Sequence, residues 1–419
     1  MCRMIFEPSR LEGEVRLSGA KNSVLKLLTA SILTSSKVEL KNYPETLLDA
    51  GIHVGMLEKL GKSCHVSMGR IVIEESQDLT TKLTWDDRSI RNTLLMLGAL
   101  TTRFGSAKVP LPGGCKLGDR SFDLHVMVLE RLGARVSEEG DYLVTEVIGE
   151  GKRLKGTDIH LPIRSTGATE NAIIAGSLAI GTTTIWNPHI RPEIIDLVNF
   201  LNTMGADIHV YGQERIVVNG VDSLDGIAYT VMPDNMEAIT WLAAAVTTKG
   251  DVEIVNFPKK DLEVALIQLE SSGAKLYFND DRVIVRGGRC LPLEISTGPH
   301  PGINSDVQPI LAAYAACANG QSTIVDLRFP GRYGYVEQMA KLGVKYEITG
   351  NALKILGHGG KLKGAEVKAV DLRAGAALAL CGMVSDGQTI INDAWQILRG
   401  YDKFVSKLQA LGAHVTLED

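Results

Sequence analysis

The chain repeats one pattern six times along its length, and this repetition restricts the folds it can adopt. In each copy a helical stretch ends at a glycine, and a short β-prone segment follows. A glycine at this point supplies the left-handed conformation that commonly ends a helix. Successive copies lie 68 to 72 residues apart, with the glycines at Gly61, Gly133, Gly205, Gly273, Gly343 and Gly412.

A second element recurs in the same register. It is a β-prone segment that ends in most copies on Asn or Asp, as in residues 37–42 and 388–392. An apolar stretch of helical length accompanies it in every copy, for example residues 238–246 and 374–383. These stretches are too apolar for the surface of a solenoid, so they predict buried helices.

Six such repeats predict an α/β (α+β) protein of two domains, each with three repeats, with helices inside and sheets outside. We expect an N-terminal domain at residues 21–229 and a C-terminal domain made of residues 1–20 plus 230–419. Residues 11–17 read as a strand missing from the last repeat, so the N-terminus is expected to return and complete the C-terminal domain. Crossings near Ala20 and Tyr229 would then form a hinge over a cleft.

Charge and cysteine usage exclude several classes of protein. The net charge is −5 and no basic run occurs, which argues against nucleic acid as a partner. The six cysteines form no CxxC pair, a pattern typical of a reducing cytosol and not of a disulfide framework or a metal site. The N-terminus lacks the apolar core of a signal peptide, and no run is long enough to span a membrane. We therefore expect a cytoplasmic protein with no membrane partner.

One loop carries a cysteine in unusual company. Residues 109–120 contain two prolines and three glycines, so the segment is predicted to be a surface loop. Cys115 lies there beside Lys116 and Arg120, whose positive charges favour the thiolate. A reactive thiol and a structural cysteine in a turn are both compatible with this pattern.

Cations gather at the starts of the apolar helices. Lys21, Arg91 and Arg373 are placed where a helix N-terminus already attracts anions, so they predict sites for phosphate or carboxylate. Caps with surface ion pairs are the alternative, but recurrence at equivalent points of the repeat favours anion sites. Arg332 and Arg399 lie in glycine-flanked loops, where an arginine fork can reach an anion. Asp306 is the carboxylate among these cations, either an ion-pair partner or a general base.

Several short motifs have a more specific meaning. They are Ser18-Gly19-Ala20-Lys21-Asn22, Leu111-Pro112-Gly113-Gly114-Cys115, Asp123-Leu124-His125, Gly167-Ala168-Thr169-Glu170-Asn171, Pro192-Glu193-Ile194-Ile195-Asp196, Asp371-Leu372-Arg373-Ala374 and Arg399-Gly400-Tyr401. With the six-repeat plan, they resemble the UDP-N-acetylglucosamine 1-carboxyvinyltransferase family over nearly the whole chain. That resemblance implies two inside-out α/β barrel domains. It also implies transfer of enolpyruvate from phosphoenolpyruvate to a sugar 3-hydroxyl in peptidoglycan synthesis, without a metal or other cofactor.

The resemblance also implies residue roles. Cys115 matches the general acid, the residue that fosfomycin alkylates, and Asp306 matches the proposed base near the sugar. Six cations match positions that bind phosphoenolpyruvate or clamp the closed state: Lys21, Arg91, Arg120, Arg332, Arg373 and Arg399. Other matches surround the sugar, the uracil and the diphosphate. The candidate catalytic residues are thus Cys115, Asp306, Lys21 and Arg399. The candidate substrate-binding residues are Asn22, Arg91, Arg120, Asp123, Leu124, Ser165, Gly167, Arg332, Asp371 and Arg373.

The chain departs from the family pattern on the acceptor side. Ile163 stands where the family usually has a lysine, and residues 188–193, 233–237, 302–306 and 330–335 differ from the usual motifs. Three readings remain open. One is transfer to UDP-N-acetylglucosamine, and another is transfer to a different nucleotide, such as UMP, in a specialised pathway. The third is a non-catalytic paralogue that binds a nucleotide sugar. The related shikimate-pathway enzymes share the fold, but Cys115 and the uracil-side residues argue against that acceptor.

Overall fold

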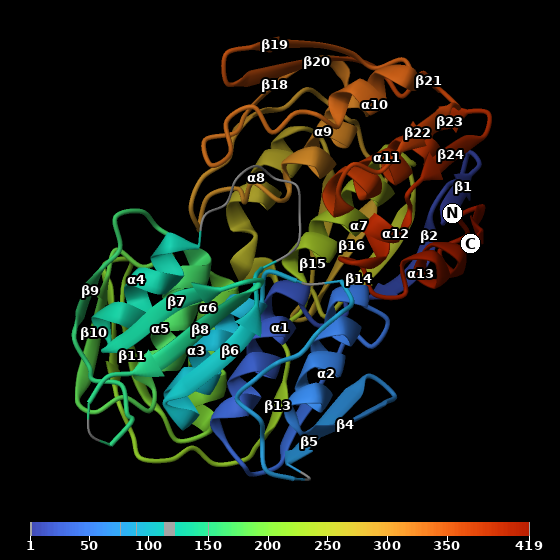
Figure 1. Ribbon diagram of the computed structural model, residues 1–419. Coiled ribbons are helices and arrows are strands. Elements are labelled where there is room, and N and C mark those ends of the chain that lie inside the picture. Colours follow the sequence, from blue (N-terminus) through green and yellow to red (C-terminus); the bar gives the residue numbers. More distant parts are fainter. Residues whose placement is uncertain (1, 76, 89, 113–121, 150, 419) are drawn as a thin grey trace. The chain divides into compact units, whose positions relative to one another are not determined.

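The computed structural model describes residues 2–75, 77–88, 90–112, 122–149 and 151–418 (Figure 1). The chain divides into two compact units. We call residues 19–45 and 49–232 the N-terminal unit, and residues 1–18, 46–48 and 233–419 the C-terminal unit. The chain therefore passes between the units after Ser18 and after Met232, and Thr46–Leu48 belongs to the C-terminal unit.

The apolar stretches form the predicted buried helices. All of α7 and α9 is buried, because most of their side chains are apolar and the buried Glu237 of α7 is paired with Lys407. These core helices are α1 (Lys21–Ala30), α3 (Thr93–Phe104), α5 (Thr166–Gly176), α7 (Asn235–Thr247), α9 (Gln308–Cys317) and α11 (Leu372–Met383). In the C-terminal unit α9 packs against both α7 and α11, and in the N-terminal unit α3 packs against α1 and α5.

A second helix in each repeat ends at the glycine that the sequence indicates. The backbone angle φ of these glycines lies between 84° at Gly412 and 114° at Gly61, a conformation that side-chain-bearing residues rarely adopt. The helices are α2 (Leu48–Leu60), α4 (Asp123–Arg131), α6 (Pro192–Thr203), α8 (Glu263–Ser271), α10 (Val336–Lys341) and α13 (Phe404–Ala410). Shorter helical segments are η1 (Ser31–Leu33), η2 (Lys259–Asp261) and α12 (Trp395–Leu398).

Small mixed sheets pack on these helices. In most of them the edge strand pairs in parallel with its neighbour, and the other pairings are antiparallel. In the N-terminal unit the sheet orders are β13 (Ala228–Thr230), β3 (Val38–Lys41), β5 (Arg70–Glu75), β4 (Lys62–Ser67); β6 (Ser106–Pro110), β8 (Tyr142–Val147), β7 (Ala134–Glu139); and β11 (Asp207–Tyr211), β12 (Arg215–Asn219), β10 (Thr182–Trp186), β9 (Asp158–His160).

The C-terminal unit repeats the arrangement. Its sheet orders are β15 (Lys275–Phe278), β16 (Arg282–Arg286), β14 (Asp251–Val255), β2 (Glu12–Arg16); β17 (Glu294–Ser296), β18 (Asn319–Val325), β20 (Ala352–His358), β19 (Lys345–Thr349); β22 (Glu366–Lys368), β24 (Thr389–Asn392), β1 (Arg3–Phe6), β25 (Val415–Glu418); and β21 (Leu362–Lys363), β23 (Ser385–Asp386).

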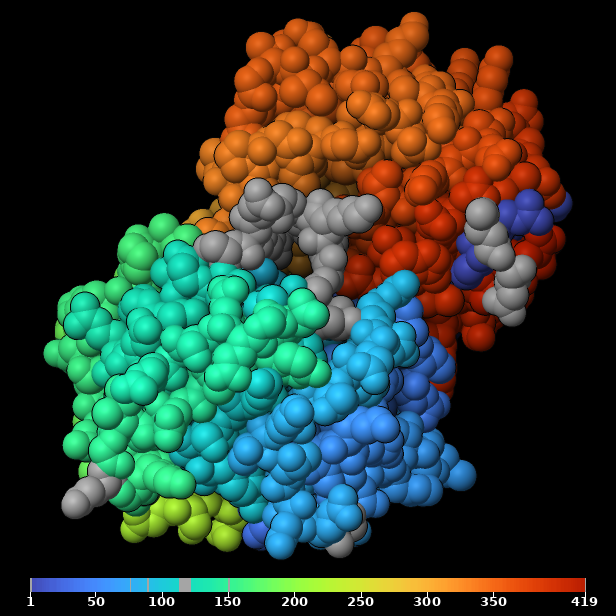
Figure 2. Space-filling view, viewed as in Figure 1, coloured from blue at the N-terminus to red at the C-terminus, as the bar shows by residue number. Residues whose placement is uncertain are grey.

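The N-terminal strands complete two sheets of the C-terminal unit, and here one expectation is wrong. The strand that completes the last repeat is β1, which lies between β24 and β25. Residues 12–16 form β2 instead, and it pairs in parallel with β14. The burial pattern explains the assignment: β1 buries Met4 and Phe6 and suits a central strand, whereas β2 buries only Val15 and suits an edge. Figure 2 shows the dark blue N-terminal residues against the red C-terminal ones.

The repeats also exchange their edge strands. In the third repeat the edge strand β9 precedes its core helix α5 and pairs with β10, the strand that follows this helix. The strand before α1 is β2, which joins the C-terminal unit, while the strand before α7 is β13, which pairs with β3 in the N-terminal unit. Each unit thus receives an edge strand from the chain segment that leads into the other.

Polar residues after the strands tie these sheets to the core. Asn42 and Asn187 adopt positive φ, and their side-chain amides donate to Val231 O at 3.1 Å and Leu161 O at 2.8 Å. In the fifth repeat the buried Asp326 has this place, and it accepts hydrogen bonds from Thr297 at 2.9 Å and Ser305 at 2.6 Å. Asp326 therefore fixes the start of the segment that carries Asp306.

Candidate active site

The C-terminal unit brings four of the predicted site residues together at the N-terminal ends of α9 and α11. Asp306 lies just before α9, and its Oδ1 accepts a 2.9 Å hydrogen bond from Arg332 Nη1. Asp371 caps α11 by accepting from the backbone N–H groups of Arg373 and Ala374, both at 2.8 Å. Its second oxygen lies 3.9 Å from Arg332 Nη2. Arg332 is thus held between the two carboxylates.

Arg373 is the most deeply buried cation of this group, with 2% of its surface exposed. Its guanidinium lies over the Tyr401 ring, 5.1 Å from the centroid, and no carboxylate of the described residues lies within ion-pair distance of it. Its Nε and Nη1 have no hydrogen-bond partner among the described residues. Buried donors of this kind are rarely left unsatisfied, so the arrangement suits an incoming anion.

Arg399 lies in the same neighbourhood. It follows α12, is 8% exposed, and donates from Nη1 to Gln396 Oε1 at 3.1 Å. The adjoining Gly400 comes so close to Arg373 that a Cβ there would lie 3.5 Å from Arg373 Nη1 and 2.2 Å from Leu372 Cδ1. A glycine is therefore required for this segment to pack on the first turn of α11.

Two further polar side chains at this site were not expected from the sequence. Gln308, the first residue of α9, is fully buried, and neither its Nε2 nor its Oε1 has a hydrogen-bond partner among the described residues. The buried Tyr335 hydroxyl faces Gln308 and Arg332, and burial raises the pKa of this phenol well above its usual value. Tyr335 belongs to a segment that differs from the family pattern, which is a signal that could have indicated it.

In the N-terminal unit Lys21 and Asn22 begin α1. Lys21 is 8% exposed, and its Nζ forms a 2.8 Å ion pair with Asp49 Oδ2 on α2. Asn22 is partly exposed at the second position of the helix. Asp49 was not expected from the sequence, because its position 28 residues beyond Lys21 follows no motif spacing.

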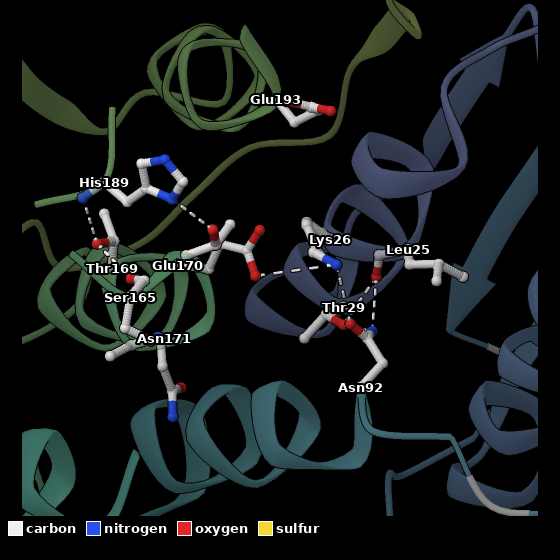
Figure 3. Close-up of polar contacts among 12 residues, drawn as sticks. Leu25, Lys26, Thr29, Asn92, Ser165, Thr169, Glu170, Asn171, His189 and Glu193 are labelled. Carbon is white, nitrogen blue, oxygen red and sulfur yellow. Dashed lines mark hydrogen bonds and ion pairs between the residues drawn. The ribbon is translucent and has the colours of Figure 1, made fainter. Parts of the chain in front are cut away.

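A network of buried polar groups joins α1, the residue before α3, and α5 (Figure 3). Lys26 lies between Asn92 Oδ1 at 3.5 Å and Glu170 Oε2 at 3.8 Å. Asn92 donates to Leu25 O and Thr29 Oγ1, both at 2.9 Å, and this anchors the start of α3 to α1. A lysine four residues after Asn22 in an apolar helix was the signal that could have drawn attention to it.

Glu170 is fully enclosed in this network. Its Oε1 has no hydrogen-bond partner among the described residues. Burial raises the pKa of its carboxyl to about 7, because Lys26 and Arg191 only partly offset the loss of hydration and Glu193 opposes them. At neutral pH about half of the molecules therefore carry a neutral Glu170.

The start of α5 is organised by hydroxyl groups and two histidines. Ser165 caps the helix, and Thr166 Oγ1 lies 2.7 Å from His189 Nδ1. His189 in turn donates its backbone N–H to Thr169 Oγ1 at 3.0 Å. Gly167 faces His125, because a Cβ at Gly167 would lie 2.8 Å from His125 Nε2.

Two histidines next to this network, His125 and His53, are neutral. Burial lowers the pKa of His125 to about 3, and Arg91 and Lys26 lower it further than Asp123 raises it. Burial and Lys26 likewise lower the pKa of His53 to about 3. The two imidazoles therefore act as hydrogen-bonding groups and add no positive charge at physiological pH.

The departures on the acceptor side have a structural counterpart. Ile163, in the place of the family's lysine, is 53% exposed, so the positive charge expected there is absent. Arg191 forms a bidentate pair with Glu193, with both contacts at 2.7 Å. Burial opposes ionisation of Glu193, but this pair outweighs burial and lowers the pKa of the carboxyl below its usual value.

The remaining predicted residues lie apart or outside the described part of the chain. Asp123 and Leu124 begin α4, where Asp123 is exposed, and Arg91 precedes α3 by two residues. Cys115 and Arg120 lie outside the described residues. Of the segment around them, Val109 and Pro110 end β6, an edge strand in which a proline is tolerated.

A pH-dependent stability follows from Glu170. Its raised pKa favours the protonated form in the folded state, so this stabilisation is complete below pH 4.5 and is lost as the pH rises through about 7. The shift corresponds to about 3 kcal/mol. We expect Glu170→Gln to unfold at a higher denaturant concentration than the wild type at pH 8 and at nearly the same concentration at pH 4.5.

Glu193→Gln is the matched control for that measurement, because the pKa of Glu193 is shifted in the opposite direction. This variant should unfold more easily than the wild type at pH 8. Equal stabilities of the wild type and Glu170→Gln at both pH values would contradict the burial argument.

The described residues contain no helix long and apolar enough to cross a membrane. They also contain no group of three or more His, Cys, Asp or Glu side chains that could hold a metal ion. The polar residues described above in the two units can bind anions through arginine and lysine, and Asp306 is a group that can transfer a proton.

Comparison with known proteins identifies the family. The family model of EPSP synthase (3-phosphoshikimate 1-carboxyvinyltransferase) matches residues 5–408. The chain belongs to the enolpyruvyl transferase family. It is 38% identical over 410 residues to UDP-N-acetylglucosamine 1-carboxyvinyltransferase 2 of Carboxydothermus hydrogenoformans, covering 97% of this chain and 96% of that protein. It is 37% identical over 415 residues to the UDP-N-acetylglucosamine 1-carboxyvinyltransferase of Sphingopyxis alaskensis, covering 97% and 96%.

Solved structures agree with this assignment. The enolpyruvyl transferase NikO from Streptomyces tendae is 25% identical and has a TM-score of 0.88, with 99% of this chain and 98% of that chain covered. An EPSP synthase from Acinetobacter baumannii is 18% identical with a TM-score of 0.78 and full coverage of both chains, which shows the shared fold. The predicted two-part inside-out α/β class is thus confirmed, and this enolpyruvyl transferase is an enzyme.

Proposed function

We propose that this enolpyruvyl transferase transfers the enolpyruvyl group of phosphoenolpyruvate to the 3-hydroxyl of UDP-N-acetylglucosamine and releases phosphate. The observation that carries the proposal is the full-length identity of 36% to 38% to enzymes named for this reaction. Peptidoglycan precursor synthesis in the cytoplasm and alkylation of Cys115 by fosfomycin belong to the same proposal.

The proposed residue roles follow the chemistry of the addition. Asp306 removes the proton of the acceptor hydroxyl, whose oxygen bonds to C2 of phosphoenolpyruvate while Cys115 protonates the methylene carbon. Loss of a proton from that carbon and departure of phosphate restore the double bond, so the products are the enolpyruvyl ether and phosphate. Arg373, Arg332, Arg399 and Lys21 would stabilise the phosphate and carboxylate charges, because cations held in place before the reaction need no reorganisation.

A second candidate is the same transfer to another uridine nucleotide, such as UMP. The exposed Ile163, and Arg191 engaged with Glu193, favour it, because both changes lie where a diphosphate-linked sugar is expected to bind. The non-catalytic reading is not supported, because the enzymatic family is shown and Asp306 and the arginines are retained.

Phosphate release from phosphoenolpyruvate tests the proposal. The purified protein is mixed with phosphoenolpyruvate and either UDP-N-acetylglucosamine, UMP, uridine or shikimate 3-phosphate, with Cys115→Ala as the control variant. We expect release only with UDP-N-acetylglucosamine and none from the variant. Release only with UMP would contradict this proposal and support the second candidate function.

A further inference from the structure

We propose that Lys26 binds a phosphate oxygen of the nucleotide acceptor and thereby determines acceptor affinity. This inference rests on the proposed function and concerns the acceptor half of that site. The contacts of the Lys26 ammonium differ from those of the enclosed Lys21 and Lys62.

Lys26 is loosely held. An ammonium group has three N–H donors, yet the contacts of Lys26 Nζ are 3.5 Å to Asn92 Oδ1 and 3.8 Å to Glu170 Oε2, at the limit of useful interaction. The buried Lys62, in contrast, donates to Thr34 O at 2.7 Å and to Glu75 at 3.0 Å. Lys21 lies 2.8 Å from Asp49. The side chain of Lys26 also remains 14% exposed, so within the described part of the chain Lys26 has access and lacks a close acceptor for its N–H groups.

The surroundings of Lys26 are suited to an anion. Lys26 lies one turn after Asn22 on the same face of α1, and it is adjacent to the residue before α3 and to the second turn of α5 (Figure 3). Helix N-terminal regions carry partial positive charge from their free N–H groups. Asn22, Ser165 and Gly167 in these regions are also the proposed acceptor-binding residues. The ammonium of Lys26 supplies there a charge that Ile163 does not.

Glu170 controls how much charge Lys26 can offer to an anion. It is 3% exposed, and its Oε1 has no hydrogen-bond partner among the described residues, which is unusual for a carboxylate that serves as a full ion-pair partner. A protonated Glu170 leaves Lys26 with a net charge to offer, whereas an ionised Glu170 neutralises it. The acceptor and Glu170 should therefore compete for Lys26.

The competition predicts a pH dependence. The charged groups that face Glu170 are Lys26 from α1 and Arg191 and Glu193 from α6. His53 on α2 and His125 on α4, which also interact with Lys26, are neutral throughout the range. Because the pKa of Glu170 is about 7, affinity for a phosphorylated acceptor should fall as the pH rises from 6 to 8.

The test measures binding without turnover. Calorimetry gives the Kd of UDP, UMP and uridine for the wild type, Lys26→Met and Lys26→Arg at pH 6.5. Loss of a charge-assisted hydrogen bond should raise the Kd of UDP and UMP by about 10- to 100-fold in Lys26→Met. Uridine should bind equally to all three proteins, and Lys26→Arg should stay within about threefold of the wild type.

Lys62→Met is the matched control, because it also removes an enclosed ammonium. Its thermal midpoint should fall while the Kd of UDP stays constant. Glu170→Gln provides an arm that does not depend on Lys26 variants. The terminal phosphate of UDP titrates with a pKa of about 6 in both measurements, so the effect of Glu170 is read from the ratio of the two Kd values. The wild-type Kd divided by the Kd of Glu170→Gln should rise from pH 6 to 8. A Lys26→Met variant that binds UDP like the wild type, or equal pH profiles of the wild type and Glu170→Gln, would overturn the inference.

The outcomes separate this inference from the proposed function. If the wild type releases no phosphate with any acceptor but UDP binding still depends on Lys26, the proposed reaction fails and the subsite stands. If turnover occurs with UDP-N-acetylglucosamine and Lys26→Met leaves both UDP affinity and the acceptor KM unchanged, the reaction stands and the subsite is wrong.

Discussion

Asp306→Asn should lower kcat by about 10²- to 10⁴-fold, the range expected for loss of a positioned general base. Asparagine retains the shape of aspartate and an oxygen that can accept the hydrogen bond from Arg332 Nη1, so the local structure should persist. The KM for phosphoenolpyruvate should change little, because the base acts on the acceptor hydroxyl. Single-turnover phosphate release with saturating substrates measures the effect directly.

The control for this variant is Asp222→Asn. Asp222 is also paired with an arginine, Arg153 at 2.8 Å, but its side chain is 94% exposed. That change should leave kcat unaltered. A variant Asp306→Asn that keeps more than about a tenth of the wild-type kcat would show that Asp306 serves only to hold Arg332 and that another group accepts the proton.

Arg373→Met should make the enzyme less stable and nearly inactive. Its buried guanidinium lies against Tyr401 without an ion pair among the described residues, and two of its nitrogen atoms lack partners. Burial opposes the charge, but Tyr401, Asp234 and Asp306 outweigh burial and raise the pKa of the guanidinium above its usual value. An apolar side chain loses this attraction and should destabilise the fold by about 1 to 3 kcal/mol. Removing a preorganised cation from the reacting phosphate should lower kcat/KM for phosphoenolpyruvate by about 10²- to 10³-fold.

Thermal unfolding with and without phosphoenolpyruvate tests both parts of this prediction. A ligand that binds the folded state raises the midpoint. The wild type should therefore gain stability on addition of phosphoenolpyruvate, while Arg373→Met should start lower and gain less. Arg373→Lys retains a charge without the planar fork and should lie between them in activity. A midpoint for Arg373→Met that equals or exceeds that of the wild type without ligand would show that Tyr401, Asp234 and Asp306 do not offset the burial of the guanidinium.

The sequence by itself determined the features that depend on local chemistry. Gly61 and its five counterparts end helices because a left-handed residue is needed there, whatever packs around them. The stretches that form α7 and α9 are mostly apolar and can only be stable when buried. The prediction of anion sites at the helix starts is also local, since a helix N-terminus favours anions wherever it lies.

Only the tertiary structure decided which distant residues meet. Residues 12–16 read correctly as a strand, but their assignment to the edge of β14 and not to the last repeat depends on competition with β1 for the same sheet. Lys21 with Asp49 and Lys26 with Glu170 are pairs separated by 28 and 144 residues, and no local pattern links them. Such contacts depend on how α1 packs with α2 and α5 in the folded unit. The partners of a charge are therefore set by packing, whereas the need for a partner is already present in the sequence.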